Sequence, residues 1–316
     1  MKLPSIVGSA ALAGAVAVVI AHGGLTAQAP AQPQAPAPAQ GRGAAPAQGR
    51  GAAQTAQQTA LIDLTGNWVS VIDQDWRFRM MTPPAGDFAQ VPLTAAGRGA
   101  VRFDAAQYGG VNYQTSGIVD CRAYGGANLL RMPTRLRISW DSPNVLKIET
   151  DWGQQTRLLR FNPAQLAGDV EQLLRSGEIG GSRGAASMQG YSAALWEIPY
   201  RFNQNFFQPR AQGTGRAGGG LGAIRAQEVQ EGGTLAVVTT DLAPGWLRRN
   251  GAPYSARTRM IEHFMTFQDP TGKDWFTVTI EVIDPEYLNT PFYISAEFQK
   301  EPDGSKWAPH PCKQVG

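Results

Sequence analysis

Two residue types that carry much of enzyme chemistry are scarce in this chain. Its 316 residues include only two cysteines and three histidines. The two histidines beyond the N-terminal region, His263 and His310, form no His-x-His or Glu-x-x-His spacing, so the sequence predicts no bound metal. Gly190-Tyr-Ser192 lacks the second glycine of a nucleophile elbow, which argues against a serine hydrolase.

Charge is also sparse and nearly balanced. Charged side chains make up 17% of the chain and the net charge is +3. This excess is too small to predict binding to nucleic acid. A match to the dinucleotide fingerprint at 213–218 lies in a glycine-rich tract without a surrounding βαβ unit, so no cofactor is expected.

Long apolar runs are absent beyond the N-terminus. The run Ile6–Ile20 has 15 residues, and about 20 are needed to span a bilayer as a helix. It follows Lys2 and precedes the small residues 27–29, an order typical of an export signal. We therefore expect residues 1–29 to be a cleaved signal peptide, the mature chain to have no membrane span, and the protein to be periplasmic or secreted. An uncleaved signal anchor is the alternative.

Composition divides the rest of the chain. Residues 30–60 form an Ala/Gln/Pro/Gly tract with almost no large apolar side chain, which predicts a disordered linker. The folded domain is expected over 61–316, with a low-complexity surface loop at 203–232. In an oxidising compartment the even cysteine count predicts one disulfide between Cys121 and Cys312, with two unpaired thiols as the alternative.

Apolar and polar side chains alternate with period two in much of the folded domain, which is typical of antiparallel sheets with one buried face. The alternating segments are Trp76–Met80, Arg135–Trp140, Leu146–Glu149, Phe276–Val282 and Phe292–Gln299. Further strands are expected at 67–72, 155–161, 234–241 and 257–267, and hairpin turns at 141–144 and 269–272.

One helix is expected between an Asn162 cap and a terminating Gly177. About ten strands with a single short helix predict a mainly β protein. We expect an antiparallel, calycin-like β-barrel, with a two-sheet β-sandwich as the alternative.

Arginine is frequent on the predicted strands. If some polar faces point into a barrel, Arg77, Arg79 and Arg157 would line a pocket suited to a carboxylate or another anion. The alternative for each arginine is a solvent-facing charge that discourages edge pairing. Glu262 lies on an apolar strand face, so it needs a partner or an altered pKa, and we assign it to the same ligand-binding site. Glu262 and the adjacent His263 are also the candidates for an acid–base catalyst.

The segment Leu64-Thr-Gly66-Asn-Trp68-Val-Ser-Val resembles the Gly-x-Trp first strand of lipocalins and the wider calycin barrels. The resemblance implies that Gly66 and Trp68 pack at the closed end of a barrel. In that family an arginine from the last strand lies beside the tryptophan, and the last expected strand here, 292–300, has no arginine.

A second resemblance covers most of the folded chain and points to an uncharacterised family of exported bacterial proteins. The segments that resemble it are Asp63–Trp68, Asp75–Met80, Cys121–Gly125, Gln189–Ser192, Pro244–Ser255, Glu262–Phe264 and Asp284–Phe292. No activity is implied. The resemblance does imply that the cysteine pair and the Glu262 strand belong to a shared framework.

These observations favour an exported β-barrel that binds a small amphipathic or anionic molecule. One alternative is an envelope enzyme that uses Glu262 or His263 as acid or base on a barrel scaffold. Another is a non-catalytic envelope protein that docks a protein partner through a sheet edge or the 203–232 loop.

Overall fold

The computed structural model describes residues 53–101, 120–175, 185–197 and 233–313. The expected signal peptide, most of the expected linker and the 203–232 loop lie outside these residues. No helix in the described part of the chain is long and apolar enough to cross a membrane.

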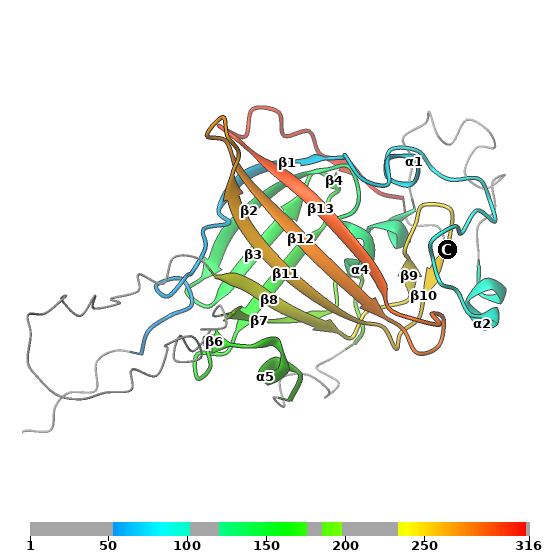
Figure 1. Ribbon diagram of the computed structural model, residues 1–316, viewed down its shortest axis with the longest axis horizontal. Coiled ribbons are helices and arrows are strands. Elements are labelled where there is room, and N and C mark those ends of the chain that lie inside the picture. Colours follow the sequence, from blue (N-terminus) through cyan, green and yellow to red (C-terminus); the bar gives the residue numbers. More distant parts are fainter. Residues whose placement is uncertain (1–52, 102–119, 176–184, 198–232, 314–316) are drawn as a thin grey trace, which may run out of the picture. The chain divides into compact units, whose positions relative to one another are not determined.

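Nine strands close into a β-barrel (Figure 1). Neighbours in the ring are antiparallel, except that β5 and β7 pair in parallel and so complete the closure. In order around the ring, the strands are β5 (Thr156–Phe161), β3 (Val145–Thr150), β2 (Arg135–Ser142), β1 (Gly66–Val71), β13 (Phe292–Glu301), β12 (Asp274–Ile283), β11 (Arg259–Gln268), β8 (Thr234–Thr240) and β7 (Tyr191–Glu197). The closed ring confirms the predicted barrel over the sandwich.

The inward-facing side chains pack into one hydrophobic core. Phe276 stacks on Phe298 with ring centroids 4.7 Å apart, and Trp68 meets Phe276 edge-on at 4.8 Å. The indole N–H of Trp68 donates to the Leu64 carbonyl at 2.8 Å, and Lys300 Nζ lies 5.3 Å from the ring centroid. A lysine from β13 therefore lies beside the tryptophan of the first strand.

Sequence alternation did not predict β7. This strand carries buried side chains on both faces, because α5 (Val170–Arg175) covers its outer side. Ala193 and Leu195 face outward against Leu173 of this helix, while Ser192 faces the interior. A strand buried on both faces has no polar alternate positions and so gives no period-two signal.

The strand predicted at Trp76–Met80 is wrong, because this segment forms the helical turn α1 (Trp76–Arg79). Asp75 has a left-handed backbone with φ of 52°, which turns the chain away from the extended path of β1. Its carbonyl then accepts the N–H groups of Phe78 and Arg79 at 2.8 and 3.0 Å. Five alternating residues do not distinguish a strand from a single helical turn.

The helix predicted at 162–177 is correct only in its second half. The Asn162 side chain accepts the Ala164 N–H at 2.9 Å and forms a turn instead of a helix cap. Residues Ala167–Gly168 (β6) then pair with β7. The Asp169 carboxylate accepts the Gln172 N–H at 2.9 Å at the start of α5, and Gly177 lies outside the described residues.

Most of the other short elements gather where β1 ends and β13 begins, on the right of Figure 1. They are α1, α2 (Ala95–Gly99), η2 (Cys121–Tyr124), α4 (Gly126–Leu129), β4 (Trp152–Gly153), β9 (Gly245–Trp246), β10 (Pro253–Tyr254) and β14 (His310–Pro311). The predicted Cys121–Cys312 disulfide is present and joins η2 to the residue after β14. We call this the capped end. The opposite end, with the β2–β3 and β11–β12 turns, is the hairpin end.

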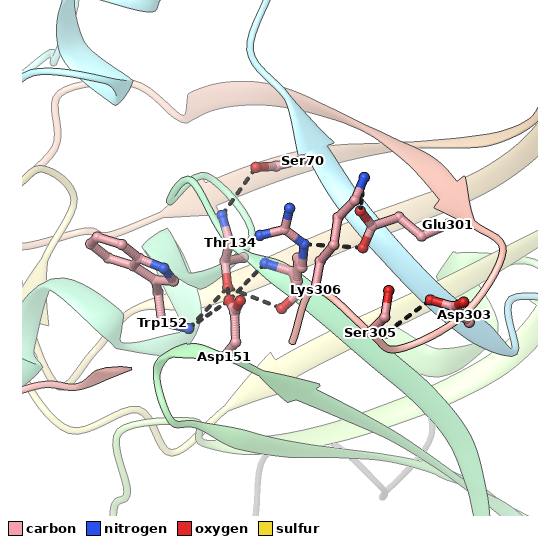
Figure 2. A network of polar contacts seen from close by, with 9 residues as sticks. Ser70, Thr134, Asp151, Trp152, Glu301, Asp303, Ser305 and Lys306 are labelled. Atoms are coloured by element: carbon pink, nitrogen blue, oxygen red, sulfur yellow. Dashed lines mark hydrogen bonds and ion pairs between the residues drawn. The ribbon is translucent and has the colours of Figure 1, made fainter. Parts of the chain in front are cut away.

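Asp151 fastens the capped end to the barrel (Figure 2). Its buried Oδ1 accepts the Thr134 hydroxyl at 2.9 Å and the N–H groups of Arg135 and Trp152 at 2.8 and 2.7 Å. The Asp151 carbonyl accepts the His310 N–H at 2.9 Å. One residue thus links the start of β2, the short strand β4 and the C-terminal β14.

The start of the domain lies earlier than the sequence indicates. The predicted linker includes residues 53–60, but Ala56 is fully buried at the hairpin end. Its N–H donates to Asn144 Oδ1 at 2.8 Å, and its carbonyl accepts the Trp196 indole N–H at 2.9 Å. The small side chain at position 56 allows this close packing, which composition alone does not reveal.

Candidate anion site at the capped end

Arg157 and Glu262, two of the predicted ligand-binding residues, form an ion pair inside the barrel. Arg157 Nη1 donates to Glu262 Oε1 at 2.8 Å, and Nη2 donates to Oε2. Neither side chain is more than 1% exposed. Arg157 lies on β5 and Glu262 on β11, so the pair connects strands that are not neighbours in the ring.

Two hydroxyl groups complete this interior network. Ser192 Oγ accepts from Arg157 Nε at 3.2 Å, and Thr239 Oγ1 accepts from Nη2 at 2.8 Å. Each nitrogen of the guanidinium therefore has a partner within the barrel. The geometry gives Arg157 and Glu262 a structural role, and their part in ligand binding stays a prediction.

His263 and Glu262 lie on opposite faces of β11, as alternation in a strand requires. His263 Nδ1 is 2.9 Å from Glu197 Oε2 on the outer side of the barrel. The hydrogen bond to Glu197 raises the pKa of His263, and the same bond lowers the pKa of Glu197. The two predicted acid–base candidates therefore do not share a pocket.

The two predicted arginines of α1 have different surroundings. The Arg77 side chain is 67% exposed and pairs with Asp87. Arg79, only two residues further on, is 2% exposed. Its Nε donates to the Arg131 carbonyl at 3.0 Å. Arg79 therefore belongs to a group of buried arginines that the alternation pattern does not reveal.

Arg79, Arg131 and Arg248 form this group, which we call the arginine cluster. Their exposed fractions are 2%, 2% and 1%. Both terminal nitrogens of Arg79, Nε of Arg131 and all three guanidinium nitrogens of Arg248 are buried without a hydrogen-bond acceptor among the described residues. Buried guanidinium groups are normally paired, because an uncompensated charge in the interior is costly.

Arg131 is the centre of the cluster. It follows α4, and its Nη1 donates to the Leu247 carbonyl at 3.4 Å, next to Arg248. Its Nη2 donates to Asp75 Oδ2 at 3.0 Å. Arg248 lies with its guanidinium carbon 3.9 Å from the centroid of the Phe78 ring. The helix α1, the end of α4 and the segment after β9 thus bring the three arginines together.

The three guanidinium groups carry more positive charge than their one direct ion-pair partner balances. Burial, and then the charge of Arg131, lower the pKa of Arg79 to about 10. The same two causes lower the pKa of Arg248 to about 10. All three side chains remain charged at neutral pH. Only Asp75 forms an ion pair with any of them in the described part of the chain.

Two acidic side chains lie near the edge of the cluster. Burial, and then the charge of Asp73, raise the pKa of Glu297 to about 6. The charges of Asp73 and Glu297 raise the pKa of Arg79, whereas the charge of Arg131 lowers it. Glu297 Oε1 accepts from Gln74 Nε2 at 3.2 Å, and a side-chain hydrogen bond with Asp73 also favours the protonated form of Glu297.

Sequence reasoning selected one member of the cluster, Arg79, as a ligand-binding residue. The sequence pattern singles out neither Arg131 nor Arg248. The available signal was the pair Arg248-Arg249 after Trp246-Leu247, an unusual placement of charge within an apolar segment. No sequence pattern indicates that this pair meets α1.

Comparison of the chain with protein-family models, with curated proteins and with solved structures gave no match. The described residues contain no group of three or more histidine, cysteine or acidic side chains that could hold a metal ion.

Proposed function

We propose that this protein is an exported β-barrel that binds a small anion through Arg79, Arg131 and Arg248 at its capped end. The observation that carries the proposal is the set of buried guanidinium nitrogens that have no acceptor in the described part of the chain. An anion would supply the missing acceptors and the missing negative charge at once.

The donor geometry indicates the class of anion. Among the described residues only Asp75 forms an ion pair with the three guanidinium groups, while Asp73, Asp87 and Glu297 act on them at longer range, so a bound anion would add negative charge in direct contact. Arginine presents several N–H donors in a fixed planar fork, which suits the oxygens of sulfate, phosphate or a phosphate monoester. The protein already holds these donors in place, so binding costs little free energy for ordering the side chains.

The cellular location is part of the same proposal. A basic residue, a short apolar run and a small-residue site at the N-terminus support export. The Cys121–Cys312 disulfide supports an oxidising compartment. We infer a periplasmic or secreted protein, and N-terminal sequencing of the chain recovered from outside the cytoplasm tests this.

Thermal unfolding in sulfate tests the binding proposal. A ligand that binds only the folded state raises Tm, by an amount that corresponds to about 2.7 kcal/mol at a concentration of about 100 times Kd. We expect sodium sulfate to raise Tm more than sodium chloride at equal ionic strength, and calorimetric titration to give one site per chain. Equal effects of the two salts would overturn the proposal.

Substitutions separate a binding site from a structural one. Arg79→Met and Arg248→Met should each abolish the sulfate effect, while Arg137→Met is the matched control, since Arg137 lies on the Trp307 ring at 4.2 Å and outside the cluster. Removing an unpaired buried charge should leave the anion-free protein as stable as before or more stable. If Arg248→Met lost stability and kept the sulfate effect, the cluster would be structural.

A further inference from the structure

Three large apolar side chains are exposed in the segment that supplies Arg79 to the arginine cluster. Trp76, Met80 and Met81, in and directly after α1 (Figure 1), are between 44% and 56% exposed. Single exposed apolar residues are common on protein surfaces and need no explanation. A group of them beside polar atoms instead marks a surface that contacts something other than water.

The turn α1 brings apolar and charged side chains to one side of the chain. The Met80 N–H donates to the Trp76 carbonyl at 2.9 Å, so these residues lie one turn apart on the same face, as positions i and i+4 do. Arg79 is at position i+3 from Trp76 and shares this face. The Trp76 and Met80 side chains reach solvent, whereas the Arg79 guanidinium is buried and its terminal nitrogens have no acceptor among the described residues.

Asp75 and Phe78 connect this turn to the other two arginines. Asp75 directly precedes Trp76, its side chain is partly exposed, and its Oδ2 accepts from the buried Arg131 at 3.0 Å. The Phe78 ring centroid lies 3.9 Å from the guanidinium carbon of Arg248. The exposed apolar side chains therefore lie at the edge of the arginine cluster, where it reaches the surface.

We propose that the anion bound by the arginine cluster is amphipathic, an inference that rests on the proposed function. Its class is a monoester of phosphate or sulfate with a short apolar chain. The charged group contacts the guanidinium groups, and the chain lies on Trp76, Met80 and Met81, which removes apolar surface of both partners from water. Methionine side chains are flexible and adapt to apolar groups of different shapes.

The small size of the exposed apolar surface favours a soluble amphiphile over a bilayer. A helix that lies on a membrane has a long apolar face that enters the acyl region, whereas α1 has four residues. Three side chains are enough to cover one short apolar chain. We therefore assign the site to a single molecule in solution.

Two phosphate monoesters with the same charged group test the contribution of the chain. Methyl phosphate and hexyl phosphate differ only in the length of their apolar part. Calorimetric titration of the full-length chain should show that hexyl phosphate binds at least about tenfold more tightly, a difference of about 1.4 kcal/mol. Burial of about two methylene groups is sufficient for this gain. Equal affinities would overturn this inference and leave the anion site intact, whereas no binding of either ester would overturn both.

Substitution of the exposed side chains provides the matched variants. Trp76→Ser/Met80→Ser should lower the affinity for hexyl phosphate to that for methyl phosphate. Unchanged binding of methyl phosphate would show that the arginine cluster is intact in this variant. Met265→Ser/Phe267→Ser is the control, because these side chains are similarly exposed on β11 towards the hairpin end, and it should keep the preference for hexyl phosphate. A preference that survives in Trp76→Ser/Met80→Ser would overturn the inference.

Vesicles distinguish a soluble amphiphile from a membrane lipid. Phosphatidic acid has a phosphate monoester as its headgroup, so vesicles of phosphatidylcholine and phosphatidic acid present the same charged group on a bilayer. We expect the wild-type protein to stay in solution when these vesicles are sedimented. If the wild type sedimented with them and Trp76→Ser/Met80→Ser did not, the partner would be a bilayer surface and the assignment to a soluble molecule would be wrong.

Discussion

Arg157 and Glu262 meet inside the barrel through two parallel hydrogen bonds, with neither side chain more than 1% exposed. The pair spans the parallel closure, because Arg157 on β5 is separated from β11 by β7 and β8. Ser192 and Thr239 on these two intervening strands bond the same guanidinium. The network therefore fixes the register of four strands at the point where the ring closes.

Removing one partner of this pair should be strongly destabilising. Glu262→Gln leaves Arg157 charged and buried, so we expect a loss of about 3–5 kcal/mol in the free energy of unfolding. The double change Arg157→Met/Glu262→Leu should cost much less, because no buried charge remains. Chemical denaturation measures both variants, and Glu286→Gln, at an exposed position, is the control. If Glu262→Gln were as stable as the wild type, the Arg157–Glu262 pair would have no structural role.

The outer pair of His263 and Glu197 should make stability depend on pH. The pKa of His263 is raised, so its contribution is fully present below about pH 6.5 and is lost as pH rises through the raised value. The pKa of Glu197 is lowered, so its contribution is present above about pH 4.5 and is lost as pH falls. The pair should therefore contribute most between these two values.

The measurement compares wild type with His263→Gln across this range. Because both side chains are partly exposed, the difference in the free energy of unfolding should be at most about 1 kcal/mol. It should be largest near about pH 5.5 and shrink in alkaline solution. A difference that grows with rising pH would show that the sign of the coupling is wrong.

Anion binding at the arginine cluster should strengthen as pH falls. Glu297 has a pKa of about 6 and lowers the net positive charge near Arg79 when it ionises. Sulfate stays divalent over this range, so protonation of Glu297 should tighten its binding between about pH 7.5 and about pH 5.5. Glu297→Gln should bind sulfate equally well at both values. Calorimetric titration measures the sulfate affinity at the two pH values. If the affinity of the wild type did not change with pH, Glu297 ionisation would not be coupled to anion binding.

The disulfide should stabilise the capped end as well as the whole domain. It closes a loop of 191 residues, and its removal in a Cys121→Ser/Cys312→Ser variant should cost about 2–5 kcal/mol. We also expect earlier hydrogen exchange in η2 and β4 than in β12, since β12 is held by two barrel neighbours. If hydrogen exchange became faster by the same factor in all strands, the disulfide would stabilise the whole domain and not the capped end in particular.

Part of the fold was predictable from local pattern. The long strands β12 and β13 alternate over several residues, and the predicted turn at 269–272 joins β11 to β12 through aspartate, proline and glycine. In contrast, β7 has apolar side chains on both faces and α1 is one turn long. Neither carries a periodicity that distinguishes its conformation, because that conformation depends on what packs against it.

The candidate site was less predictable than the fold. Arg79 and Arg157 are both arginines in alternating segments, yet one has unpaired nitrogens and the other is fully paired. The difference lies in Glu262, which is 105 residues away from Arg157 in the sequence. Ion pairing between distant strands follows from barrel register, and a single sequence does not give that register.

By itself the sequence determined the mainly β character, the positions of the longer alternating strands and the cysteine pair, because these depend on side-chain period and residue count. Only the tertiary structure decided that the parallel β5–β7 pairing closes the ring, and that Arg79, Arg131 and Arg248 meet at one end of it. Both results depend on contacts between segments far apart in the chain. The free energy of those contacts comes from packing and charge in three dimensions, which no local pattern encodes.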